Sequence, residues 1–200
     1  MNHMEFFAQL KAGGIHGAYL FEGPEEYIKA SALTAAEKAL LPAGLEQLNE
    51  TRLENPATDA LIAAAETLPF MADKRLVVVR ELAALTGRSE SDERLLDYIG
   101  KIPDTCVVIF YVQGKVDARK KLAAALKKQG TVVSFAPLED AALNAWIVRT
   151  AKNLGKEIAM GDAAYLSFTV GTDAATIKSE LEKLASLAGE RPSITREDIQ

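Results

Sequence analysis

The chain has 200 residues, of which 48% are hydrophobic and 26% charged, so it can bury a sizeable core as one domain or as two small ones. No segment approaches the roughly 18 consecutive apolar residues of a membrane span. The N-terminus lacks the basic residues followed by an apolar stretch that mark a secretory signal, so a cytoplasmic location is expected. The formal charge of -5 argues against DNA binding by this chain alone, and the single cysteine excludes disulfide frameworks and cysteine-rich zinc sites.

Runs of apolar, β-branched or aromatic residues predict buried strands in the first two thirds of the chain. Four runs are strong and a weaker fifth alternates apolar and polar residues; they cover residues 18–22, 75–82, 105–113, 131–136 and, for the weak run, 45–53. Helical stretches lie between them, at residues 25–41, 57–68, 92–101 and 118–128. This alternation predicts an α/β fold with a mainly parallel sheet and helices on both faces.

The pattern changes after Leu138, and no further strand is expected there. The segment DAALNAWIVRTAKNLG is amphipathic and predicts a helix that stops at Gly155. Further helices are expected at residues 161–170 and 173–188. We therefore expect the domain boundary near Leu138.

A fourth helix of this part has only begun where the sequence stops, with Ser193 or Thr195 as its cap. The sequence thus predicts an α/β domain at residues 1–138, a small all-helical domain at residues 139–200, and a longer protein to which both belong.

The turn after the first strand resembles a phosphate-binding loop in position but not in composition. Such a loop has the form GxxxxGK followed by Ser or Thr, because its backbone N–H groups, lysine and hydroxyl hold the phosphates and the metal. Here Pro24, Glu25 and Glu26 follow Gly23, and the two carboxylates take the place at the helix start that a phosphate would occupy. Lys29 comes without the second glycine or the hydroxyl. We expect this loop to bind no nucleotide, and we expect no cofactor.

No metal site is expected either. In phosphate-loop ATPases a strand ends in an aspartate that holds magnesium, whereas the strand at 75–82 ends in Arg80 and Glu81. An arginine at this place repels a cation. His3, in the N-terminal tail, and His16, beside a glycine, have no metal-ligand spacing between them.

Three segments, through their order and spacing over the chain, resemble the delta subunit of the bacterial DNA polymerase III clamp loader. The resemblance runs from about Ala18 to the end of the chain and includes the helical part. The three segments read YLFEGPEEYIKASAL, AAETLPFMADKRLVVVREL and VQGKVDARKKLAAALKKQGTVVSFAPL.

The resemblance implies an AAA+ type, RecA-like core followed by a helical lid domain. A helical collar domain follows in full-length members, and we expect it to be absent here. Delta subunits of this family do not hydrolyse ATP, which fits the altered turn. They bind the ring-shaped β sliding clamp and open one of its interfaces within a loader that contains gamma or tau and delta prime. These proteins, and DNA through the assembled complex, are the implied partners, and no membrane partner is expected.

The family's clamp-contacting element is a short hydrophobic wedge before the second strong strand, and it matches Leu68, Pro69, Phe70 and Met71. A proline-stiffened turn with a large aromatic ring and a flexible thioether can fill an apolar pocket of a partner. The alternative is that Leu68 and Phe70 close the core beneath the sheet, since apolar residues near the start of a strand usually pack inward. The resemblance favours the wedge.

Two other interpretations stay open. The basic segment with Lys115, Arg119 and Lys120 could contact DNA or an acidic neighbouring subunit, although charged helix faces are more often simply solvated. The chain could instead be an atypical phosphate-loop enzyme that uses Lys29, Thr34 and Glu81, or another inactive clamp-loader subunit. The single cysteine excludes an inactive clamp-loader subunit that carries a cysteine-rich zinc module.

Overall fold

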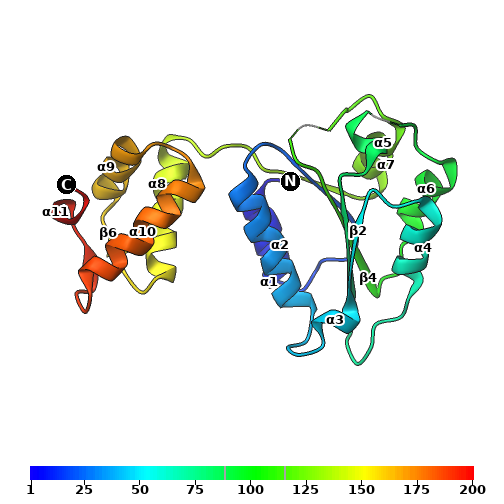
Figure 1. Cartoon of the computed structure of the whole chain (residues 1–200), viewed down its shortest axis with the longest axis horizontal. Coiled ribbons are helices and arrows are strands. Elements are labelled where there is room, and N and C mark those ends of the chain that lie inside the picture. The colour runs from blue at the N-terminus through cyan, green and yellow to red at the C-terminus, as the bar shows by residue number, and fades with distance from the viewer. Residues whose placement is uncertain (88, 115) are drawn as a thin grey trace. The chain divides into compact units, whose positions relative to one another are not determined.

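The computed structural model describes residues 1–87, 89–114 and 116–200, and the chain divides into two compact units, Met1–Ala136 and Pro137–Gln200. The first unit holds a five-stranded, wholly parallel sheet with the strand order β2-β3-β4-β1-β5 (Figure 1). Its strands are β1 (Gly17–Glu22), β2 (Glu50–Glu54), β3 (Arg75–Arg80), β4 (Cys106–Tyr111) and β5 (Thr131–Ser134). The predicted α/β fold with a parallel sheet is confirmed.

Helices cover both faces of this sheet, as Figure 1 shows. The pair α1 and α2 lies on one face, and α4, α6 and α7 lie on the other. Two short helices, α3 and α5, and a 3-10 turn, η1, complete the unit. The bounds are α1 (His3–Lys11), α2 (Glu26–Leu40), α3 (Glu46–Asn49), α4 (Thr58–Glu66), α5 (Ala83–Thr86), α6 (Glu93–Tyr98), η1 (Ile99–Lys101) and α7 (Lys121–Gln129).

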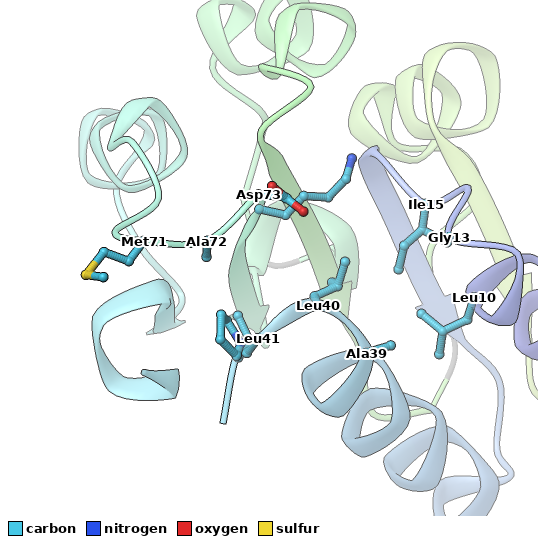
Figure 2. A pocket seen from close by; sticks show the side chains of 11 residues that line it. Leu10, Gly13, Ile15, Ala39, Leu40, Leu41, Met71, Ala72 and Asp73 are labelled. Atoms are coloured by element: carbon cyan, nitrogen blue, oxygen red, sulfur yellow. The ribbon is translucent and has the colours of Figure 1, made fainter. Parts of the chain in front are cut away.

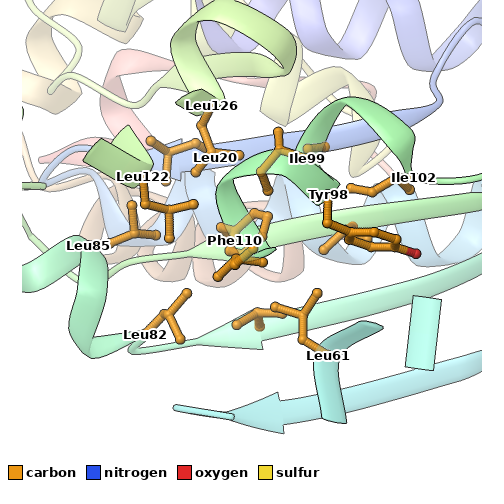
Figure 3. Close-up of a cluster of buried hydrophobic side chains, with 14 of the residues drawn as sticks. Leu20, Leu61, Leu82, Leu85, Tyr98, Ile99, Ile102, Phe110, Leu122 and Leu126 are labelled. Carbon is orange, nitrogen blue, oxygen red and sulfur yellow. The ribbon is translucent and has the colours of Figure 1, made fainter. Parts of the chain in front are cut away.

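The sheet is buried on both faces, which explains the continuous apolar runs of its strands. Successive side chains of β1 point to opposite faces: Leu20 joins the core under α4, α6 and α7, whereas Phe21 packs edge-on against Phe6 of α1 with ring centroids 5.0 Å apart. Figure 3 shows the first of these cores, in which Leu61 and Leu122 from the helices surround Phe110 of the central strand β4. The result is a rigid platform for the loops at its two ends.

One predicted feature of this unit was wrong and another was confirmed only in part. His3 does not lie in a tail but in α1, where it is buried. The Asn2 side chain accepts a hydrogen bond from the Glu5 N–H and the Glu5 carboxylate accepts one from the Asn2 N–H, so a capping box starts this helix. The weak strand predicted at 45–53 is confirmed in its second half, which is β2, whereas its first half is the helical turn α3. A short run of apolar and polar residues fits either structure.

The second unit consists of α8 (Asp140–Asn153), α9 (Met160–Val170), α10 (Ala174–Ala188) and α11 (Arg196–Ile199), with two short strands. The prediction of a purely helical segment missed these strands, β6 (Glu157–Ile158) and β7 (Ser193–Ile194), which pair in parallel. Strands of two residues carry no alternation that a sequence pattern could reveal. Thr195, rather than Ser193, caps α11 in a capping box with Asp198.

Cys106 at the start of β4 should be inert in the folded protein. Its side chain is fully buried, and this burial raises the pKa of the thiol to about 12. We expect no alkylation by iodoacetamide at pH 8 in native buffer and rapid alkylation in denaturant, because only the thiolate reacts. Mass spectrometry at timed intervals measures both rates. Native-state modification as fast as that of glutathione would contradict the burial.

Within the described residues, none of the helices has the length and apolar content that crossing a membrane requires. In the same residues, no group of three or more His, Cys, Asp or Glu side chains is arranged so that it could hold a metal ion.

Candidate functional site

An exposed apolar loop precedes β3 at the amino-terminal edge of the sheet. We call Leu68, Pro69, Phe70 and Met71 the apolar loop. The residues Leu68, Phe70 and Met71 are 76%, 53% and 78% exposed, while Pro69 is half-buried. The alternative that Leu68 and Phe70 close the core does not fit these exposures. Large apolar groups gathered in one short segment are typical of a protein-binding surface.

The backbone of the apolar loop is held by the side chain of Asn49, the last residue of α3. The Phe70 N–H donates to Asn49 Oδ1 at 2.7 Å, and Asn49 Nδ2 donates to the Phe70 carbonyl oxygen at 3.0 Å. Asn49 is fully buried and also donates to the Leu45 carbonyl oxygen at 3.1 Å. The next residue, Met71, has a φ of 50°, a left-handed conformation that is uncommon for a non-glycine residue. The loop is therefore exposed in its side chains and fixed in its main chain.

A pocket of about 590 Å³ adjoins the apolar loop. Figure 2 shows Met71, Ala72 and Asp73 on one side of it and Leu10, Gly13 and Ile15 on the other, with the end of α2 between them. Its walls are mixed, since apolar side chains stand beside Asp73 and Lys74. The apolar loop and the pocket share Met71.

The altered nucleotide loop lies at the opposite, carboxyl-terminal edge of the sheet, where ligands of open α/β folds usually bind. Its backbone is already paired: the Gly23 N–H donates to the Gly114 carbonyl oxygen at 3.3 Å, and the Glu25 N–H donates to the Phe135 carbonyl oxygen at 3.0 Å. Gly23 has a φ of 117°, and a Cβ at this residue would lie 2.4 Å from the Phe135 oxygen. N–H groups that would cradle a phosphate are thus bonded within the protein.

Lys29 fills the space behind this loop and is fully buried. Its ammonium donates to the carbonyl oxygens of Gly23 and Val112, both at 2.7 Å, and to Glu26 Oε1 at 2.6 Å. The other oxygen of Glu26 accepts from the Tyr111 hydroxyl at 3.0 Å. The pKa of the Tyr111 hydroxyl is raised well above its usual value, mainly by burial and secondly by this hydrogen bond. The lysine that would reach phosphates in an ATPase is here a structural cation.

The atypical enzyme site of Lys29, Thr34 and Glu81 is not assembled. Lys29 and Thr34 are five residues apart on α2, which turns them about 140° away from each other, and Lys29 is buried while Thr34 is exposed. Glu81 accepts a hydrogen bond from the Gln113 N–H at 2.9 Å. Arg80 stacks on the Tyr111 ring, 4.5 Å from its centroid, where a metal-binding aspartate would stand.

This geometry predicts that the chain binds no ATP at millimolar concentration. The reason is that the Gly23 and Glu25 N–H groups and the Lys29 ammonium already have partners inside the fold. Isothermal calorimetry with magnesium-ATP measures this directly. A saturable heat of binding would show that this loop does bind ATP and would contradict the prediction.

The basic segment is largely neutralised by neighbouring acids where the structure describes it. Arg119 donates to both carboxylate oxygens of Asp117 at 2.9 and 3.0 Å, and this pairing lowers the pKa of the Asp117 carboxyl to about 2. Lys120 pairs with Glu90 at 2.7 Å. Lys115 lies outside the described residues. Contact of this segment with DNA or another subunit stays a prediction.

The comparisons with known proteins agree on one family. The family model described as DNA polymerase III, delta subunit, matches residues 19–136. The DNA polymerase III subunit delta of Bacillus subtilis is 30% identical over 205 residues, which cover 98% of this chain and 59% of that protein. The solved structure of the Bacillus subtilis DNA clamp loader delta protein YqeN aligns over 98% of this chain and 61% of its own, with a TM-score of 0.78 and 28% identity.

A more distant structure shows the breadth of the fold. The Thermotoga maritima RuvB Holliday junction branch migration motor aligns over 98% of this chain and 64% of its own, with a TM-score of 0.52 and 14% identity, and so shares the AAA+ type fold alone. The chain spans about three fifths of the length of its Bacillus subtilis relatives. With a family model that covers more than half of its residues and a relative at this level of identity, the chain belongs to the DNA polymerase III delta subunit family.

Proposed function

We propose that this chain is a non-catalytic part of a clamp loader, which binds the β sliding clamp through the apolar loop and opens one of its interfaces for loading onto DNA. The observation that carries the proposal is the exposure of Leu68, Phe70 and Met71 on a backbone that Asn49 fixes. Its partners would be the clamp and the gamma or tau and delta prime subunits, with DNA reached through the assembled complex.

The chemistry of the apolar loop suits a clamp contact. Binding energy at interfaces is concentrated in a few large side chains that enter desolvated pockets, and aromatic residues are prominent among them. A preordered backbone reduces the conformational entropy that is lost when Phe70 is immobilised in a partner. The loop can therefore act as a stiff wedge rather than as a flexible tether.

The proposed lack of catalysis is supported by the arrangement at the other edge of the sheet. Lys29 is held by three oxygens within the fold, and the strand end that would carry a magnesium ligand carries Arg80. The altered nucleotide loop and the apolar loop lie at opposite edges of the sheet, so clamp binding would not involve the nucleotide loop. An ATPase fold is kept here as a scaffold for a binding loop.

Release of clamps from circular DNA tests the opening role. We expect an excess of this chain to accelerate the release of β clamps preloaded on nicked circular DNA without added ATP, and gel filtration separates free from DNA-bound clamp. The Phe70→Ala variant should leave the release at its spontaneous rate. If wild-type chain binds the clamp but does not speed its release, the opening role is refuted and binding alone remains.

A further inference from the structure

We propose that Asn49 is a positioning residue, which sets the direction in which Phe70 is presented to the clamp. The inference rests on the proposed function and adds a residue outside the apolar loop to it. A partner protein cannot contact Asn49 directly, since this residue is fully buried. It would act on clamp binding only through the main chain of Phe70.

The hydrogen-bonding capacity of the Asn49 amide is matched by its surroundings. Its oxygen accepts from the Phe70 N–H at 2.7 Å, and its nitrogen donates to the carbonyl oxygens of Phe70 and Leu45 at 3.0 and 3.1 Å. Both backbone groups of one residue are thus bound by one side chain, in the manner of a strand partner. Neither aspartate, which cannot donate when ionised, nor leucine of similar size can reproduce these bonds.

These side-chain bonds are important because the main chain gives the loop little support of its own. Among the described residues, no backbone-to-backbone hydrogen bond joins Leu68, Pro69, Phe70 or Met71 to another part of the chain. The left-handed φ of 50° at Met71, directly after Phe70, is a conformation that neighbouring contacts must maintain. The Asn49 amide supplies such contacts at the adjacent peptide.

Asn49 is itself joined to the parallel sheet through β2. It ends α3 and directly precedes β2, and Glu50 of β2 is in register with Leu76 of β3. The apolar loop leads into that same β3 strand. Asn49 therefore links the two strands to the loop: β2 follows it in the chain, and its side chain bonds the backbone of Phe70, in the loop that leads into β3.

A double-mutant cycle on clamp affinity tests this role. We expect Asn49→Ala to weaken binding of the β clamp about tenfold in the wild-type background and less than about twofold in the Phe70→Ala background, because the two residues act as one unit. The matched control is Asn55→Ala at the other end of β2. Asn55 Oδ1 accepts from the Ala83 N–H at 2.9 Å, away from the apolar loop, so this variant should lose stability and keep its clamp affinity.

The outcomes separate the inference from the proposed function. If Phe70→Ala weakens binding but Asn49→Ala leaves the affinity of the folded molecules unchanged, or the two effects simply add, the positioning role is overturned and the clamp contact stands. If neither wild-type chain nor any variant binds the clamp, the proposed function fails and the inference fails with it.

Hydrogen exchange of the wild-type chain decides the question should Asn49→Ala not fold. The Phe70 amide should exchange much more slowly than in an unstructured peptide of the same sequence, although its side chain is exposed, because its N–H is bonded to a buried acceptor. Exchange at the unprotected rate would overturn the positioning role.

Discussion

Replacing Phe70 with alanine should weaken binding of the β sliding clamp by about 2–4 kcal/mol, the range of a central aromatic anchor. The thermal midpoint should change little, because Phe70 is 53% exposed and its ring leaves no core cavity when removed. Titration calorimetry and thermal denaturation of the same preparation measure the two effects side by side.

Companion variants sharpen this prediction. Leu68→Ala and Met71→Ala should each weaken binding by less than Phe70→Ala, whereas Phe168→Ala serves as the control, since Phe168 lies in the second unit and is 86% exposed. A large fall in the melting temperature with unchanged clamp affinity would instead assign Phe70 to the core.

Gly23→Ala should destabilise the fold by about 3–5 kcal/mol. Two physical causes combine at this residue: the φ of 117° is unfavourable for any side chain, and the new Cβ would lie 2.4 Å from the Phe135 carbonyl oxygen, which is part of the backbone and cannot swing away. Urea denaturation followed by circular dichroism gives the change in unfolding free energy.

Gly114→Ala is the matched control for that change. Gly114 also has a positive φ, of 79°, but nothing lies within 4 Å of its Cβ position, so only the backbone strain of about 1–2 kcal/mol should appear. Equal losses in the two variants would show that the contact between Gly23 and Phe135 does not matter. The clamp affinity of folded Gly23→Ala molecules should be preserved, because the apolar loop stands at the other edge of the sheet.

The sequence predicted the parts of the fold that rest on long, consistent patterns. The strand β4 reads as a continuous apolar run because both faces of the sheet are covered, and the alternation with helices predicted parallel strands. Short elements escaped, since the four residues of α3 and the two of β6 are below the length at which a period can be recognised. The helix α1 was missed although its signal, Asn2 with Glu5 three residues later, was present.

The candidate site could be predicted only in part. Leu68 and Phe70 are large apolar residues of the kind that usually pack in a core, and their exposure is seen only in the structure. The residues around Gly23 predicted a loop unsuited to nucleotides, but not that Lys29 would turn inward to bind two carbonyl oxygens. Asn49 gave no signal, because its partner Phe70 lies 21 residues further along the chain and meets it only after β2 and β3 have paired.

The affinity of this chain for the β sliding clamp, measured with and without saturating magnesium-ATP, tests most directly whether the fold is a nucleotide-independent scaffold for a clamp-binding loop. We expect saturable binding with a dissociation constant of about 10 μM or lower, equal in the two conditions. ATP should change nothing, because the Lys29 ammonium and the Glu25 N–H already have partners within the fold. No saturable binding, or binding that appears only when ATP is added, would contradict this expectation.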